Sequence, residues 1–422
     1  MATGRTMAEK LLSRAAGQEV GAGEIVICRP DFAMGTDGSI PMALDYLAQM
    51  QGRQPSVDAP GQLVFALDHY GLQSGPNALL LQDKARQFAR QHGVVLFDAG
   101  DGIGHQLLIE EGYAAPGRLL VGADSHSTSY GALNCFGTGI GSSDLAAIML
   151  TQKLWMEVPA SIKVELRGRL RTKVSAKDIA LHLARQLGAD GANYLAMEFC
   201  GEGVEGLDMD DRIVLSNMAV ELGAKAGIFP FDPILEEYLT AIGVTDSAVV
   251  APDPDAEYLQ HVVIDLATLV PQVALPHRVD NVVDLEEADF TRVDMVYLGT
   301  CTGGRVRDYE EALEVIRAAG RLAGNVELVV TPASRRIREV LVQRGILDEF
   351  ARYGARIETP GCGACCGTCG TVAPRQKVVS SANRNFRGRM GDNTAEIYLA
   401  SSYTCAAVAV DGFIGTRVGG QP

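Results

Sequence analysis

Short apolar runs alternate with amphipathic stretches along most of the chain. The apolar runs are rich in β-branched residues and predict buried strands at residues 61–67, 94–97, 118–121, 162–166, 293–298 and 326–330. The stretches between them predict helices at residues 78–92, 144–155, 176–187, 308–319 and 332–343. Strands that alternate with helices are typical of parallel sheets with helical connections. The pattern therefore predicts an α/β fold.

This pattern is interrupted twice along the chain. Val158-Pro159 ends a first block, and proline-rich acidic segments at 229–233 and 252–255 lie near the end of a second. The length of 422 residues suits a small number of domains of about 100–200 residues each. We predict three α/β domains, at residues 1–165, 166–287 and 288–422.

The charge balance narrows the classes of partner. Lys and Arg number 37 and Asp and Glu number 52, which gives a net charge of −15. Nucleic-acid binding is carried by clustered Lys and Arg, so we expect no nucleic-acid partner. The sequence has neither a signal-peptide pattern nor an uninterrupted apolar run of about 18 residues. We therefore predict a cytoplasmic protein that does not span a membrane.

Cysteine placement is the strongest chemical signal in the sequence. The chain has nine cysteines, an odd number that favours reduced thiols and metal chemistry over a disulfide framework. Cys362 and Cys365 form a Cys-x-x-Cys pair in a glycine-rich loop, and Cys301 comes just after the predicted strand 293–298. Three thiolates on an iron–sulfur cluster would leave one corner open, which a Lewis-acid site requires.

A structural zinc ion is the alternative reading of the same loop. Four thiolates could come from Cys362, Cys365, Cys366 and Cys369. Such a site would be closed and would leave Cys301 unused. The remaining cysteines are expected to pack in the protein interior, because cysteine is among the most buried residue types: Cys28, Cys135, Cys200 and Cys405.

Three histidines lie near acidic residues where predicted strands end. His69 follows Asp68, His126 comes shortly after Asp124, and His105 follows another acidic stretch. A carboxylate beside an imidazole raises its basicity and fixes its tautomer, which makes it a competent general acid. Ligands of open α/β sheets bind beyond the carboxyl ends of the strands, so we expect these side chains to gather there.

Arginines follow the cysteine loop in the segment 381–389. Arg384 and Arg389 could bind carboxylates bidentately through their planar guanidinium groups. A solvated basic loop is the alternative, but the neighbouring Asn383 and Asn385 favour an ordered segment. The segment therefore predicts a site for a small carboxylate.

Seven short motifs are distinctive when taken together. They are VGADSHSTSYGA at 121–132, GTGIGSSD at 137–144, KLW at 153–155, VP at 158–159, GAKAG at 223–227, PGCG at 360–363 and NRNFRGRMG at 383–391. Together they resemble the aconitase superfamily, and within it the chain is most similar to the large subunits of 3-isopropylmalate dehydratases and to their homoaconitase relatives, over about residues 7–416. The resemblance implies a three-domain α/β/α architecture around a 4Fe–4S cluster, without the swivelling small domain.

The resemblance also implies roles for individual residues. It implies cluster ligands at Cys301, Cys362 and Cys365, substrate-binding roles for Ser125, Arg384 and Arg389, and catalytic roles for Asp68, His69, His105, Asp124, His126 and Glu198. His69 would protonate the departing hydroxyl group, and Asp124 and Glu198 would orient His105 and His126.

The implied activity is that of a hydro-lyase that isomerises a small hydroxy-carboxylate by dehydration and rehydration. The expected substrate is 3-isopropylmalate, as in leucine biosynthesis; the alternatives are homoaconitate, citramalate, dimethylmalate or a maleate-type acid. A cluster-dependent regulatory or binding protein is the alternative from another class.

The resemblance also implies a partner subunit, and the sequence differs from the family pattern at two places. The base that abstracts the carbon proton in this family is a serine on the swivelling domain, so a separate small subunit is expected to supply it. Gly303 stands where asparagine is usual, and Gly35-Thr36 stands where Thr-His is usual. These departures bear on the substrate and remove no predicted cluster ligand.

Overall fold

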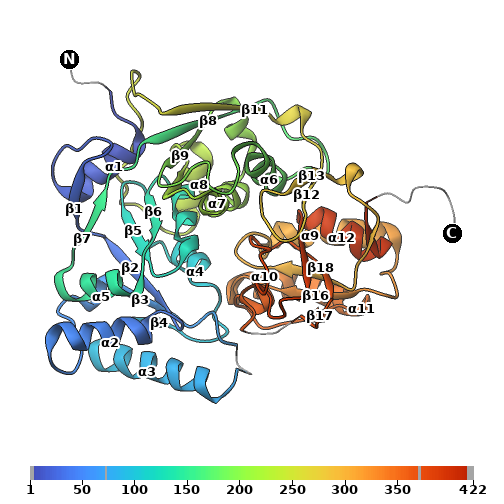
Figure 1. Ribbon diagram of the computed structural model, residues 1–422, viewed down its shortest axis with the longest axis horizontal. Coiled ribbons are helices and arrows are strands. Elements are labelled where there is room, and N and C mark those ends of the chain that lie inside the picture. The colour runs from blue at the N-terminus through green and yellow to red at the C-terminus, as the bar shows by residue number, and fades with distance from the viewer. Residues whose placement is uncertain (1–3, 72–73, 369–371, 416–422) are drawn as a thin grey trace.

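The computed structural model describes residues 4–71, 74–368 and 372–415, which form three main sheets with flanking helices (Figure 1). The first sheet is parallel, with the order β4-β3-β2-β5-β6. Its strands are β2 (Phe32–Thr36), β3 (Leu63–Ala66), β4 (Val95–Phe97), β5 (Leu119–Gly122) and β6 (Phe136–Gly139). Its helices are α2 (Ile40–Gln51), α3 (Pro76–His92), α4 (Gly104–Glu110), η2 (Ser125–Leu133) and α5 (Ser142–Thr151).

The second sheet is also parallel and has the order β10-β9-β8-β11. Its strands are β8 (Ser161–Arg167), β9 (Ala196–Cys200), β10 (Ala226–Ile228) and β11 (Gln260–Asp265). The helices of this part are α6 (Ala176–Leu187), η3 (Glu202–Gly206), α7 (Met209–Met218), η4 (Ala219–Leu222) and α8 (Pro233–Ala241), and helix α1 (Met7–Ala16) packs against β9 and β10.

The third sheet is mixed, with the order β13-β12-β19-β18-β15-β16-β17. Strand β12 is antiparallel to both of its neighbours, and the other pairs are parallel. Its strands are β12 (Gln272–Ala274), β13 (Val282–Asp284), β15 (Met295–Gly299), β16 (Glu327–Thr331), β17 (Arg356–Ile357), β18 (Lys377–Ser380) and β19 (Glu396–Leu399). Its helices are α9 (Val306–Ala319), α10 (Arg335–Gln343), α11 (Ile346–Arg352), η7 (Gly363–Cys366) and α12 (Ser402–Asp411).

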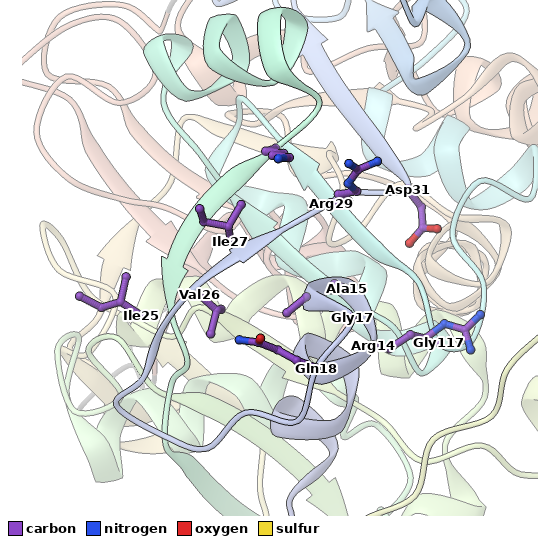
Figure 2. Close-up of a pocket in the computed structure, with 12 residues that line it drawn as sticks. Arg14, Ala15, Gly17, Gln18, Ile25, Val26, Ile27, Arg29, Asp31 and Gly117 are labelled. Carbon is purple, nitrogen blue, oxygen red and sulfur yellow. The ribbon is translucent and has the colours of Figure 1, made fainter.

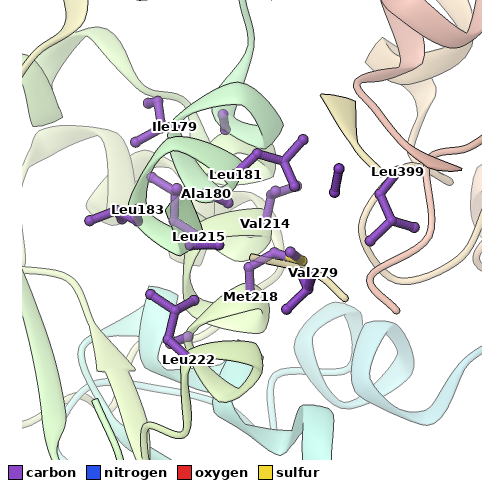
Figure 3. Packing of buried hydrophobic residues seen from close by; sticks show 14 of the residues in the cluster. Ile179, Ala180, Leu181, Leu183, Val214, Leu215, Met218, Leu222, Val279 and Leu399 are labelled. Atoms are coloured by element: carbon purple, nitrogen blue, oxygen red, sulfur yellow. The ribbon is translucent and has the colours of Figure 1, made fainter. Parts of the chain in front are cut away.

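Two helices of the second part connect it to the other sheets. Helix α7 packs against η2, whereas α6 packs against β12 and β13. One buried apolar cluster includes residues of α6 and α7 together with Leu399 of β19 (Figure 3). The same cluster contains Ala364 and Cys365. The second of the paired cysteines is therefore anchored in a core that two sheets share.

The predicted α/β fold is confirmed, but the helix predicted at residues 144–155 is partly wrong. Residues 144–155 do not form one helix, because α5 ends at Thr151 and Trp155 lies in strand β7 (Leu154–Glu157). Gln152 adopts a left-handed conformation with φ of 59°, which stops the helix. Strand β7 then pairs with β1 (Ile25–Cys28), a distant segment that no local pattern could reveal.

Three strands that the sequence predicts near the site are present with small shifts at their ends. They are β3, β5 and β15, and each leads into a segment that carries a candidate catalytic or ligand residue. The division into domains 1–165, 166–287 and 288–422 stays a prediction. Within the described ranges, no helix has the length and apolar character needed to cross a membrane.

Candidate active site

His69 is held between two carboxylates just beyond the end of β3. Its Nδ1 lies 2.7 Å from Oδ1 of Asp68, and its Nε2 lies 3.3 Å from Oδ2 of Asp124. The other oxygen of Asp68 accepts a hydrogen bond of 2.8 Å from the backbone N–H of Gly104. Asp68 is thus fixed from two sides, and it fixes the imidazole in turn.

These carboxylates determine the charge of His69. Burial alone would lower the pKa of His69, but Asp68 and Asp124 outweigh burial and raise the pKa well above its usual value. Burial would raise the pKa of Asp124, yet the nearby histidines, His105 foremost, hold it well below its usual range. At neutral pH we therefore expect a protonated imidazole beside an ionised Asp124, which is the state that a general acid requires.

Asp37 fixes the backbone at this turn, and sequence reasoning missed it. Its two carboxylate oxygens accept hydrogen bonds from the backbone N–H groups of His69 at 3.0 Å and Tyr70 at 2.9 Å. Burial and the charge of Asp68 raise the pKa of Asp37 to about 6. Asp37 comes just after β2, which neighbours β3 in the sheet. Only the pairing of these strands reveals its role.

A second group surrounds Asp124 at the start of η2. Its Oδ1 lies 2.8 Å from Nε2 of His105 and 3.4 Å from Nδ1 of His126. The Nε2 of His126 lies 2.9 Å from Oε1 of Glu221, and Nε of Arg384 lies 2.8 Å from the same oxygen. One chain of polar contacts thus joins the predicted histidines, Asp124 and Arg384.

Glu198, which the resemblance predicts to orient His105 and His126, has other hydrogen-bond partners among the described residues. The carboxylate of Glu198 is buried in β9 and accepts four hydrogen bonds of 2.9–3.1 Å, from the backbone N–H groups of Met7 and Ala8 and from the hydroxyls of Ser161 and Tyr258. Glu198 therefore ties the start of α1 to the second sheet. The partner of His126 is Glu221, which stands two residues before the GAKAG motif.

A matched pair of substitutions tests this reassignment. Glu221→Gln should lower kcat roughly ten- to a hundred-fold, because an amide orients His126 less well than a carboxylate does. Glu198→Gln should lower the free energy of unfolding by about 1–3 kcal/mol, because its amide turns a donor toward donors. It should leave kcat nearly unchanged. Steady-state kinetics and denaturant unfolding of both variants measure the two effects, and a reversed pattern would restore Glu198 to the site.

Cys301 and Cys365 each receive nitrogen donors. The side-chain amides of Asn217 and Asn383 both donate to Sγ of Cys301 at 3.2 Å. Nη2 of Arg389 donates to Sγ of Cys365 at 3.6 Å. Such donors stabilise sulfur that carries negative charge, as cluster-bound cysteine does. Asn217 was missed from the sequence because α7 lies far from the cysteines along the chain.

Cys362 joins the cysteine loop to the Asp68–His69 turn. Its backbone N–H donates to the carbonyl of Asp68 at 3.0 Å, and its sulfur lies within 4.8 Å of ligand atoms of Asp68 and His69. A cavity of about 400 Å³ beside the loop is lined in part by Asp68, Pro360, Gly361 and Gly363. The predicted general acid and the predicted cluster ligand therefore lie side by side.

The cysteine loop requires glycine at one position. Gly363 has a φ of 54°, and a Cβ there would lie 2.1 Å from the hydroxyl of Tyr297. A side chain would therefore be strained and would collide with a buried tyrosine. Glycine at this point allows the backbone to turn from Cys362 toward Cys365.

The donor set suits a cluster better than unliganded thiols. Burial and the charge of Cys365 raise the pKa of Cys301 to about 12, and burial with Asp68 raises the pKa of Cys362 well above its usual value. Neutral thiols have little need of amide donors, whereas metal-bound thiolates benefit from them. In the alternative zinc loop, Sγ of Cys366 contacts the Thr368 hydroxyl at 2.7 Å, and Cys369 lies outside the described residues.

The two departures from the family pattern have local explanations. A Cβ at Gly303 would lie 2.3 Å from Oγ of Ser381, so no side chain fits there without moving that serine. The amides of Asn217 and Asn383 contact Cys301 in any case. A Cβ at Gly35 would lie 2.6 Å from Cγ1 of Ile40, and the side-chain hydroxyl of Thr36 contacts that of Ser39 at 3.1 Å.

The remaining candidate, Ser125, lines a cavity of about 430 Å³ together with Thr138 and Lys225. Another cavity, of about 740 Å³, lies against α1 and β1 (Figure 2). Its described lining includes Arg14, Gln18 and Arg29 and none of the candidate site residues. The candidate site lies instead between the first and third sheets, where the Cys362 loop contacts the Asp68–His69 turn.

Comparisons with known proteins identify the family of the chain. The sequence matches the aconitase family (aconitate hydratase) over residues 10–291 and 286–412. It is 44% identical over 415 residues to the 3-isopropylmalate dehydratase large subunit 1 of Thermotoga maritima, covering 97% of this chain and 98% of that protein. It is 44% identical over 419 residues to the homoaconitase large subunit of Thermus thermophilus, covering 98% and 97%.

A solved structure supports the fold. The crystal structure of Thermococcus kodakaraensis aconitase X in its holo-form superposes with a TM-score of 0.53 at 13% sequence identity, covering 87% of each chain. This likeness concerns the architecture alone.

Proposed function

The chain belongs to the aconitase family, and from this premise we propose that it is the cluster-binding large subunit of a two-subunit hydro-lyase. One observation carries the proposal: Sγ of Cys362 lies within 4.8 Å of ligand atoms of Asp68 and His69, and its electrostatic neighbours Cys301 and Cys365 receive nitrogen donors. The proposed reaction is the isomerisation of a small hydroxy-carboxylate by loss and return of water.

Proteins of the aconitase family are iron–sulfur enzymes. We propose that Cys301, Cys362 and Cys365 hold a 4Fe–4S cluster in this chain. Such a cluster supplies a Lewis acid at the iron that lacks a cysteine ligand. The amide and guanidinium donors described above would offset the negative charge of the bound sulfur atoms.

The residues around this site would move and hold protons. His69 would donate its proton from Nε2 to the departing hydroxyl group, and Asp68 would keep Nδ1 of the ring protonated. Asp124 and Glu221 would orient His105 and His126 toward the polar groups of the substrate. This set lacks an obvious base for the carbon proton.

We therefore propose that a small partner subunit supplies the base. The large-subunit names of the relatives support such a partner. The proposed substrate is 3-isopropylmalate, with homoaconitate as the alternative that the Thermus relative favours; citramalate, dimethylmalate and maleate-type acids complete the set to be tested. The described cysteines are free thiols, which agrees with the proposed cytoplasmic location.

The test is anaerobic reconstitution of the chain with and without its small subunit. The loaded chain should contain iron and sulfide, and only the two-subunit form should turn over a member of the substrate panel. Turnover by the lone chain would contradict the partner's role. A loaded pair that processes no hydroxy-acid of the panel would contradict the proposed reaction.

Replacement of Arg384 and of Arg389 by lysine should have different effects on KM and on cluster retention. In the described part of the chain, the Nη atoms of Arg384 have no hydrogen-bond partner. The guanidinium group can therefore donate hydrogen bonds to a substrate carboxylate. Arg384→Lys should raise KM roughly tenfold, which is about 1.4 kcal/mol, without loss of iron. Arg389→Lys should in addition accelerate cluster loss, because Arg389 contacts Cys365. Kinetics and iron retention separate the two, and equal iron loss would contradict the distinction.

A further inference from the structure

We propose that Lys177 is the built-in countercharge of the cluster, a positioning residue that stabilises the bound cluster and raises its reduction potential. This inference rests on the proposed function, since it requires the cluster. Lys177 is not among the residues for which the sequence or the resemblance indicated a role.

Lys177 lies behind Cys301, in the first turn of α6. Its side chain is almost fully buried, with 3% of the residue exposed. Its Nζ donates to Oγ1 of Thr302 at 3.0 Å and to the carbonyl of Ala382 at 2.9 Å. Thr302 follows Cys301 directly, and Ala382 precedes Asn383, whose amide contacts the same sulfur. The ammonium group thus contacts the residue that follows Cys301 and the residue that precedes Asn383.

No ion pair compensates this buried charge among the described residues. All three acceptors of Nζ are neutral, the third being Sδ of Met218 at 3.9 Å. Burial lowers the pKa of Lys177 to about 8, and the strongest opposing influence is the sulfur of Cys301. A buried cation is costly unless an anion faces it. The first turn of a helix makes the position worse, because the helix dipole is positive there.

Asp308 is the rival counterion. It also lines the small space beside Lys177, but its oxygens accept hydrogen bonds from the backbone N–H of Arg305 at 3.0 Å and from Ser402 at 2.9 Å. Lysine directs its own hydrogen bonds toward Thr302 and Ala382 instead. A cluster with three thiolate ligands is the anion that this geometry suits.

The test compares Lys177→Met and Lys177→Gln with wild type. Glutamine retains a donor for Thr302 and Ala382 but removes the charge, so it serves if methionine prevents folding. Lys225→Met is the matched control, because burial lowers the pKa of Lys225 as it does that of Lys177, while Lys225 is only half-buried and lies over the ring of Tyr194. The measurements are the midpoint potential of the cluster in the two-subunit complex, the rate of cluster loss to a chelator, and the unfolding of the apo chain.

Both Lys177 variants should have a more negative midpoint potential and lose the cluster roughly ten- to a hundred-fold faster. The apo chain of Lys177→Gln should be at least as stable as wild type, because glutamine keeps a donor for Thr302 and Ala382 and the uncompensated charge is gone. Lys225→Met should change neither cluster property. A loaded variant with unchanged potential and loss rate overturns the inference while the proposed function stands. Destabilisation of the Lys177→Gln apo chain would overturn it in favour of a structural pair with Asp308, whereas a wild-type chain without iron would refute the proposed function itself.

Discussion

Serine in place of Cys301, Cys362 or Cys365 should abolish the visible absorbance of the anaerobically loaded protein. A hydroxyl is a far weaker ligand for iron than a thiolate, and iron–sulfur clusters are held by thiolates. Cys366→Ser should preserve the absorbance, because Sγ of Cys366 contacts Thr368 rather than the donors that surround Cys301 and Cys365. Iron and labile sulfide per chain, together with the visible spectrum, measure the effect.

The control for these variants is Cys200→Ser in β9, since Cys200 lies in a different sheet from the proposed ligands. It should retain wild-type iron and colour. We expect Cys369→Ser to do the same, as the sequence predicts. A colourless Cys366→Ser protein would show that the proposed ligand set is incomplete.

His69→Gln should lower kcat by about two to four orders of magnitude, the range typical of a lost general acid. The cluster should remain, because His69 is not one of its proposed ligands. Steady-state kinetics at matched iron content tests this, and a loaded variant with near-normal kcat would remove His69 from the proton-donating role.

The pH dependence gives an independent test of His69. Its pKa is raised by Asp68 and Asp124, so the rate of dehydration should fall only as the pH rises through this elevated value. Asp68→Asn removes one source of the shift, and the alkaline limb of the kcat profile should move to lower pH. A limb that moves to higher pH, or not at all, would show that another group controls it.

The raised pKa of His69 and the lowered pKa of Asp124 also make the free energy of unfolding depend on pH, one at the alkaline side and the other at the acidic side. The raised pKa of His69 gives stabilisation that is complete below the unfolded value of about 6.5 and is lost as the pH rises through the folded pKa. The lowered pKa of Asp124 gives stabilisation that is present above the unfolded value and is lost as the pH falls through the folded pKa. Both contributions are therefore complete only in mildly acidic solution, between unfolded pKa values of about 3.9 for Asp124 and about 6.5 for His69.

The sequence predicted those parts of the site that are local in the chain. Asp68 with His69, and Cys362 with Cys365, are neighbours whose spacing already indicates chemistry. Buried strands such as β3 and β15 were visible as apolar runs, so the residues that follow them could be placed at the sheet edge.

The sequence could not reveal contacts that depend on packing between distant elements. Glu221 reaches His126 only because α7 and η4 pack against η2. Asp37 reaches His69 only because β2 and β3 pair. Glu198 lies in a segment that resembles the family, yet its carboxylate accepts hydrogen bonds from the start of helix α1 rather than from a histidine. Three-dimensional proximity, rather than residue type, separates these cases.

The hydrogen bond from the Cys362 amide to the Asp68 carbonyl links the proposed cluster-binding loop directly to the Asp68–His69 turn. Loss of iron from the proposed cluster would therefore displace His69, the proposed proton donor, as well as remove the Lewis acid. Deuterium uptake at this single amide would then report cluster occupancy without any catalytic assay.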